Sequence, residues 1–188
     1  MESEKFLSER KKDVQTINTM IRELTEGLSL EELNREPEPG KWSILACIQH
    51  MNLYSEFYIP TFKNAINQGK SGNGHFSRGW FGGYSSRSML PRQGKVRYRM
   101  RAFKDKDPGP VKLPIDVVDQ FIKDQQEILN IIEGARMSSL STRVPTTLKG
   151  IRFQFGDALE FFVNHELRHL DQIKRTRSAI DQRHEAVH

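Results

Sequence analysis

Apolar residues recur at three- and four-residue steps along four long stretches of this 188-residue chain. This spacing places them on one face of an α-helix, so each stretch is predicted to form an amphipathic helix. Four long helices without a convincing sheet predict an all-α fold, a four-helix bundle. The stretches run from about Glu4 to Glu26, from Ser43 to about Gln68, from about Ile115 to Glu133, and from just after Gly150 to about Ile180.

The predicted second and third helices are joined by an irregular connection over about residues 69–114. Gly, Ser and Arg dominate its first part, and Asp107–Pro110 closes it with helix breakers. Residues 96–100 alternate apolar and basic side chains, so a short extended piece is predicted there. A connection this long usually has a function or covers a pocket. We therefore expect a single domain over residues 1–188, with a small-molecule pocket roofed by 69–114.

Composition narrows the class of protein. Hydrophobic residues make up 36% of the chain and no apolar run is long enough to cross a bilayer, so no membrane association is expected. The single cysteine, Cys47, rules out an internal disulfide framework and fits a reducing compartment, and the N-terminus lacks a signal-peptide pattern. We expect a cytoplasmic protein. The net charge of +5 is mildly basic and does not by itself identify a nucleic-acid binder.

Three histidines fall where core residues are expected. His165 and His169 are four residues apart on the fourth predicted helix, and they continue its apolar stripe. His50 occupies a similar place on the second helix. Buried imidazoles without partners are costly, and a shared metal ion would satisfy all three. The pattern alone leaves two interpretations open, a metal site or ordinary core and surface histidines. The other histidines, His75, His184 and His188, are expected to be solvated.

The order of short motifs resembles the DinB/YfiT-like superfamily. These are Trp42-Ser43 followed by His50, then residues 156–161 running into the HxxxH pair and Gln172. The resemblance implies a four-helix bundle with a long connection between helices 2 and 3. It implies a metal triad of His50, His165 and His169, a homodimer, and a thiol S-transferase-like or hydrolase-like activity. Zinc is the first expectation for the ion, with nickel or iron as alternatives.

Three neutral ligands would leave a divalent ion at least one open coordination position. Such an ion can activate water, polarise a carbonyl or bind a thiolate, so the expected substrate is a small molecule, such as a low-molecular-weight thiol. Five residues near the triad in sequence are candidates for a general base or for groups that orient the imidazoles. For each of them we expect instead an ordinary polar residue of the surface or the bundle. They are Tyr54, Glu56, Asn164, Glu166 and Gln172. Cys47, one turn before His50, is expected to be a small core residue.

Two rival functions stay open. One is a non-catalytic, metal-stabilised bundle with a stress-related or regulatory role, since the family resembled includes members without an assigned activity. The other is nucleic-acid binding through the basic residues between Arg87 and Lys106, with Tyr98 and Phe103 as stacking surfaces. A basic connection is more often simply solvated, so nucleic acid is not an expected partner.

Overall fold

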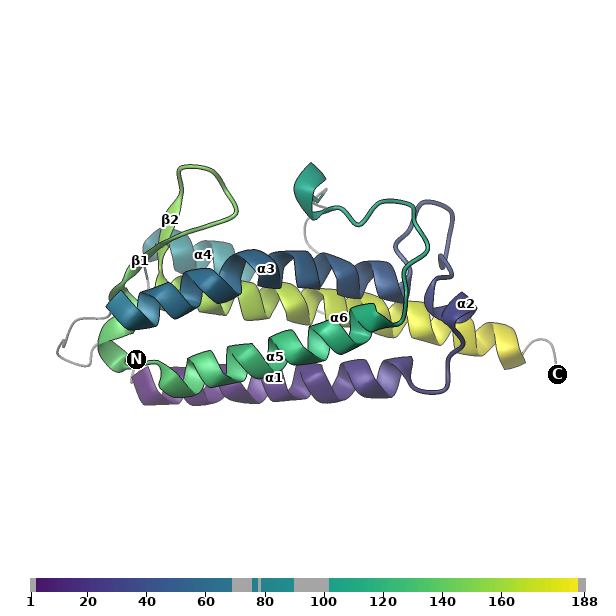
Figure 1. Ribbon diagram of the computed structural model, residues 1–188, viewed down its shortest axis with the longest axis horizontal. Helices are drawn as coiled ribbons and strands as arrows, with labels where there is room; N and C mark the ends of the chain where they lie inside the picture. Colours follow the sequence, from purple (N-terminus) through teal and green to yellow (C-terminus); the bar gives the residue numbers. More distant parts are fainter. Residues whose placement is uncertain (1–2, 69–75, 78, 90–101, 186–188) are drawn as a thin grey trace.

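The computed structural model describes residues 3–68, 76–77, 79–89 and 102–185. Four long helices run along the same axis (Figure 1). They are α1 (Ser3–Thr25), α3 (Ile44–Gln68), α5 (Asp116–Gly134) and α6 (Phe155–Glu185). Helices α1 and α3 each pack against both α5 and α6, which makes a four-helix bundle. The predicted fold class is confirmed, and the four predicted helices agree with the observed ones to within a few residues.

The apolar stripes predicted from the sequence form the core between these helices. Phe6, Ile17 and Ile21 of α1 are fully buried, as are Phe121 of α5 and Phe162 of α6. Burial of such side chains is the main driving force that holds the bundle together, at roughly 25 cal/mol per Å² of apolar surface removed from water. No described helix has an apolar stretch long enough for it to cross a membrane.

Local signals fix where two helices begin. Ser29 and Glu32 form a capping box, which opens the short helix α2 (Leu30–Leu33). The Ser29 backbone N–H donates to the Glu32 carboxylate at 2.8 Å, and the Glu32 N–H donates to Ser29 Oγ at 3.3 Å. Ser43 Oγ accepts from the Ala46 N–H at 3.1 Å and so caps the start of α3.

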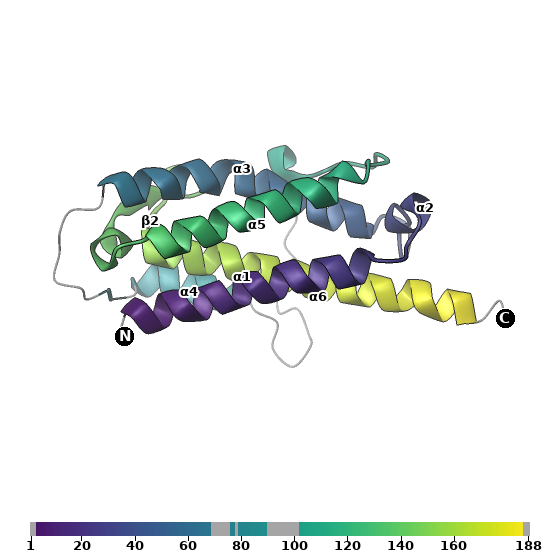
Figure 2. The ribbon, with the colours of Figure 1, turned by 60° about the horizontal axis from the view of Figure 1, so that its bottom comes forward.

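The structure adds elements that the sequence analysis did not predict. Helix α4 (Trp80–Met89) lies within the connection expected to be irregular and packs against α6. A two-stranded antiparallel hairpin, β1 (Arg143–Pro145) and β2 (Arg152–Gln154), precedes α6, with Val144 opposite Phe153. Figure 2 shows α4 beside the same end of the bundle as the N-terminus. The described residues also contain two short 3-10 turns, η1 (Lys104–Lys106) and η2 (Met137–Ser141). The extended piece predicted at 96–100 lies outside the described residues.

Helix α4 fits against α6 because Gly82 within it and Gly79 just before it both face Asp157. A Cβ atom on Gly82 would lie 2.6 Å from Asp157 Oδ2, and one on Gly79 would lie 2.8 Å from it. The Gly79 N–H donates to the same carboxylate oxygen at 2.9 Å. Only residues without a side chain allow this close approach, so the glycines of the connection determine how α4 packs.

Candidate metal centre

Two ridges of side chains meet between α3 and α6. On α3, Ala46, His50 and Tyr54 follow one another at four-residue steps and therefore share one face. On α6, His165 and His169 are also four residues apart. All three histidines are buried. One ring nitrogen from each lies within 4.8 Å of the corresponding nitrogens of the other two. The three histidines singled out in the sequence therefore come together in space.

His50 has its ring fixed by the backbone of η1. Its Nδ1 lies 2.6 Å from the Lys106 carbonyl oxygen. A carbonyl can only accept a hydrogen bond, so Nδ1 carries the proton and Nε2 presents its lone pair. That Nε2 lies 3.2 Å from Nε2 of His165. The lone pair of His50 therefore points at the neighbouring imidazole, toward the space that the three rings share.

Burial keeps the three imidazoles neutral at physiological pH. Desolvation lowers the pKa of His50, and the hydrogen bond to Lys106 only partly opposes this. Desolvation, followed by the neighbouring His169 and His50, lowers the pKa of His165 well below its ordinary value. Desolvation also lowers the pKa of His169 to about 3. Neutral imidazole is the form that binds metal ions.

Two ring nitrogens in this cluster lack hydrogen-bond partners. Within the described residues, Nδ1 of His165 and Nδ1 of His169 are buried and make no hydrogen bond. Leaving such groups unsatisfied costs roughly 1–3 kcal/mol each. A bound ion would compensate for the free-energy cost of these unsatisfied nitrogens. That cost fits a set of metal ligands, as do the neutral state of the imidazoles and the convergence of three nitrogens.

Aromatic rings enclose the three histidines. The ring of Tyr54 stacks on His165 with centroids 4.2 Å apart, and Phe161 lies on His165 at 6.4 Å in a nearly parallel orientation. Trp42 covers His50 at 4.7 Å and His169 at 5.9 Å. These contacts hold the imidazoles in place and keep water away from most of their surface. Trp42 entered the sequence analysis only as part of a motif, and its contact with the histidines was not predicted.

The residues considered as a general base or as orienting groups lie in different surroundings. Tyr54 is beside the triad, and burial raises its pKa to about 12, so its phenol keeps its proton. Glu56 is exposed, because it is two residues after Tyr54 on α3 and therefore lies on a different face of the helix. Gln172 interacts with His169 through a side-chain hydrogen bond that opposes the lowering of the histidine's pKa. Asn164 instead donates to Ser86 on α4, at 2.8 Å to its hydroxyl oxygen.

Glu166 points away from the triad into the bundle. It is fully buried, and its Oε1 accepts from Gln125 Nε2 of α5 at 2.8 Å. Desolvation raises the pKa of Glu166 to about 8. Cys47 is also fully buried in the hydrophobic core, as expected for a small core residue. His184 is exposed on α6 and pairs with Glu32 at 2.6 Å, while His75 and His188 lie outside the described residues.

Comparison with known proteins gives a family and a fold. YfiT from Bacillus subtilis, described as a probable metal-dependent hydrolase with an unusual four-helix bundle topology, is similar in structure with a TM-score of 0.60. The match covers 93% of this chain and 87% of that one at 9% sequence identity, so it shows a shared fold. Comparison with curated protein sequences gives no significant match. The model of the DinB superfamily matches residues 15–173. The match spans most of the chain and includes all three buried histidines, and the protein therefore belongs to the DinB superfamily.

Proposed function

We propose that His50, His165 and His169 hold one divalent metal ion, and that the protein is a metal-dependent enzyme acting on a small molecule. The observation that carries the proposal is the convergence of three buried neutral imidazoles whose nitrogens lie within 4.8 Å of one another. Zinc is the expected ion, with nickel or iron as alternatives, because imidazole suits all three. When bound, the ion supplies Lewis-acid chemistry.

The protein's own residues contribute order and exclusion of water. Lys106 fixes the tautomer of His50, and Tyr54 and Trp42 limit the motion of the imidazoles. The ring of Tyr54 stacks on His165 and its phenol keeps its proton, so Tyr54 is our candidate for hydrogen bonding to a substrate. Hydrolysis and thiol S-transfer both remain candidate reactions. The description of YfiT as a probable metal-dependent hydrolase supports the former.

The first test is the metal content of protein purified without added metal or chelating resin. We expect near-stoichiometric metal in the wild type and loss of metal in His50→Ala, His165→Ala and His169→Ala. His184→Ala is the matched control, because this histidine is also on α6 but pairs with Glu32. A wild type that neither contains nor takes up metal would refute the proposal. The leading function would then be a non-catalytic bundle with a regulatory or stress-related role.

We further propose that the chain is one domain over residues 1–188 that forms a homodimer in the cytoplasm. The dimer is inferred from the family resemblance, and the compartment from the single buried cysteine. Light scattering coupled to size-exclusion chromatography tests the dimer, and a mass of 21.8 kDa would indicate a monomer instead.

A further inference from the structure

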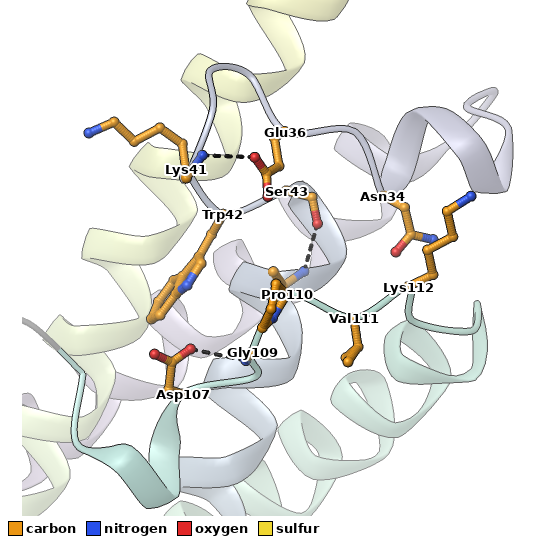
Figure 3. Close-up of a pocket in the computed structure, with 12 residues that line it drawn as sticks. Asn34, Glu36, Lys41, Trp42, Ser43, Asp107, Gly109, Pro110, Val111 and Lys112 are labelled. Atoms are coloured by element: carbon orange, nitrogen blue, oxygen red, sulfur yellow. Dashed lines mark hydrogen bonds between the residues drawn. The ribbon is translucent and has the colours of Figure 1, made fainter.

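A cleft of about 340 Å³ opens between the start of α3 and the segment that follows η1 (Figure 3). One wall is made by Trp42, Ser43 and Ala46, and the other by Asp107 and residues 109–112. This volume lies within the range of about 300–1,000 Å³ that small-molecule sites usually have.

The cleft lies beside the three histidines, with Trp42 as the residue that lines the cleft and also contacts two of them. Ala46 is one helical turn before His50 on the same face of α3, and Trp42 contacts the rings of both His50 and His169. On the opposite wall, Asp107 directly follows Lys106, whose carbonyl binds His50. Each wall therefore includes a residue next to the proposed metal site, Trp42 on one side and Asp107 on the other. A second cavity, of about 440 Å³, is lined by residues of α4, the hairpin and the start of α6, and includes no residue of the triad or its aromatic cover.

The charged groups of the cleft are arranged unevenly. Two carboxylates are held in place by backbone N–H groups: Asp107 accepts from Gly109 at 3.0 Å, and Glu36 accepts from Gly40 at 2.8 Å. Two lysines, Lys41 and Lys112, also line the cleft. In Figure 3, the Asp107 carboxylate lies at the end of the Trp42 ring, whereas the side chain of Lys41 extends away from the cleft and that of Lys112 lies beside Asn34, away from Trp42 and Asp107. Within the described residues, neither carboxylate is in an ion pair.

An aromatic face beside a fixed carboxylate is a suitable environment for a cation. The ring attracts positive charge through its quadrupole, and a tryptophan face does so most strongly. The carboxylate adds direct attraction in a partly enclosed space. Pro110 and Val111 supply apolar surface for the rest of a ligand.

We propose that this cleft is the substrate-binding site of the metal centre, and that it takes a small molecule with a positively charged nitrogen, a protonated amine or a quaternary ammonium, held between Trp42 and Asp107. This inference rests on the proposed function, because the cleft is assigned to substrate through Trp42, which lines it and contacts two of the proposed metal ligands. It deepens that function by naming the class of substrate.

The probe for the test is benzyltrimethylammonium, whose nitrogen has no lone pair and cannot bind the metal. Its binding is followed by NMR of the N-methyl protons with the zinc-loaded and the cobalt-loaded protein, and benzenesulfonate serves as the anionic counterpart. We expect the cation to bind at least fivefold more tightly than the sulfonate. We also expect its methyl signals to broaden with Co²⁺ and not with Zn²⁺, because the cleft adjoins the ion.

Two variants test the residues. Asp107→Asn keeps the hydrogen bond to Gly109 while removing the charge, and should weaken binding of the cation at least fivefold. Asp105→Asn, on the same segment but outside the cleft, is the matched control and should bind like the wild type. The proposal would be overturned if both variants lost affinity for the cation equally, or if the protein preferred benzenesulfonate. It would also be overturned if the cation did not bind, or if it bound without broadening of its methyl signals by Co²⁺. Failure of the proposed function has a different signature, because a protein that takes up no metal could still bind the cation in the cleft.

Discussion

Lys106 makes two hydrogen bonds to α3, one to the side chain of His50 and one to the backbone of Leu53. Its carbonyl oxygen lies 2.6 Å from His50 Nδ1, and its Nζ donates to the carbonyl oxygen of Leu53 at 2.8 Å. One residue thus binds the proposed metal ligand with its backbone and the next turn of the same helix with its side chain. The side-chain bond holds the turn η1 in place, so the orientation of His50 depends on a lysine 56 positions away in the sequence.

The first prediction concerns this arrangement. Lys106→Met should weaken metal binding about threefold to tenfold. This is less than the roughly 10–100-fold loss that is typical when a group that orients a metal ligand is removed, because the backbone carbonyl that contacts His50 remains in the variant. Competition with a chromogenic chelator measures the affinity. Lys104→Met is the control, since Lys104 is exposed on the same turn. If both variants bind metal like the wild type, Lys106 does not position His50.

The sequence could predict the four long helices because each carries a strong apolar period. It could single out the three histidines because they continue that period, whereas their interpretation as a metal triad came from the family resemblance. It could not predict the hydrogen bond from His50 to Lys106. That bond is made by a backbone carbonyl, which every residue has, so no side-chain pattern marks it. The cover provided by Trp42 also depends on the tertiary approach of the chain before α3 to α6.

Helix α4 was missed for a different reason. Its sequence, with Gly82, Gly83 and three serines, has a low intrinsic tendency to form a helix. Tertiary packing against Asp157 on α6 outweighs that tendency, and the glycines that weaken the prediction are the residues that permit the contact. The hairpin was missed because each strand has three residues, too few to show a period.

The close approach of α4 to α6 can be tested at a glycine. A Cβ on Gly82 would lie 2.7 Å from Asp157 Cβ, so Gly82→Ala should force the helices apart and lower the free energy of unfolding by about 1–3 kcal/mol. Gly134→Ala, at the end of α5, meets no atom within 4 Å and should be neutral or slightly stabilising. Urea denaturation of both variants gives the comparison, and equal stabilities would contradict the packing described.

The thiol of Cys47 should be inert in the folded protein. It is fully buried, and desolvation raises its pKa well above the ordinary value, so almost no thiolate exists at neutral pH. We expect no reaction with Ellman's reagent until denaturant unfolds the chain, and then one thiol per chain. Rapid reaction of the native protein would show that Cys47 reaches the surface or the metal site.

The capping box should make stability depend on acid. The side-chain and backbone hydrogen bonds from Ser29 lower the pKa of Glu32 from 4.5 to about 2. A lowered folded-state pKa contributes stability that is fully present above the unfolded pKa and is lost as the pH falls through the folded pKa. Glu32→Gln should therefore be less stable than the wild type at pH 7. The difference should shrink between about pH 4.5 and 2, as thermal melts across that range would show. A difference that does not change with pH would mean that Glu32 acts through packing alone.

Metal should stabilise the fold through the three histidines. An ion that binds only the folded state raises the free energy of unfolding by about 2.7 kcal/mol when its free concentration is 100 times Kd. For a chain of this size that corresponds to a rise in Tm of roughly 5–10 °C. Added zinc should therefore raise the Tm of the chelator-treated wild type and of His184→Ala, and should leave that of His165→Ala unchanged. A zinc-induced rise in His165→Ala equal to that of the wild type would place the stabilising ion somewhere other than between α3 and α6.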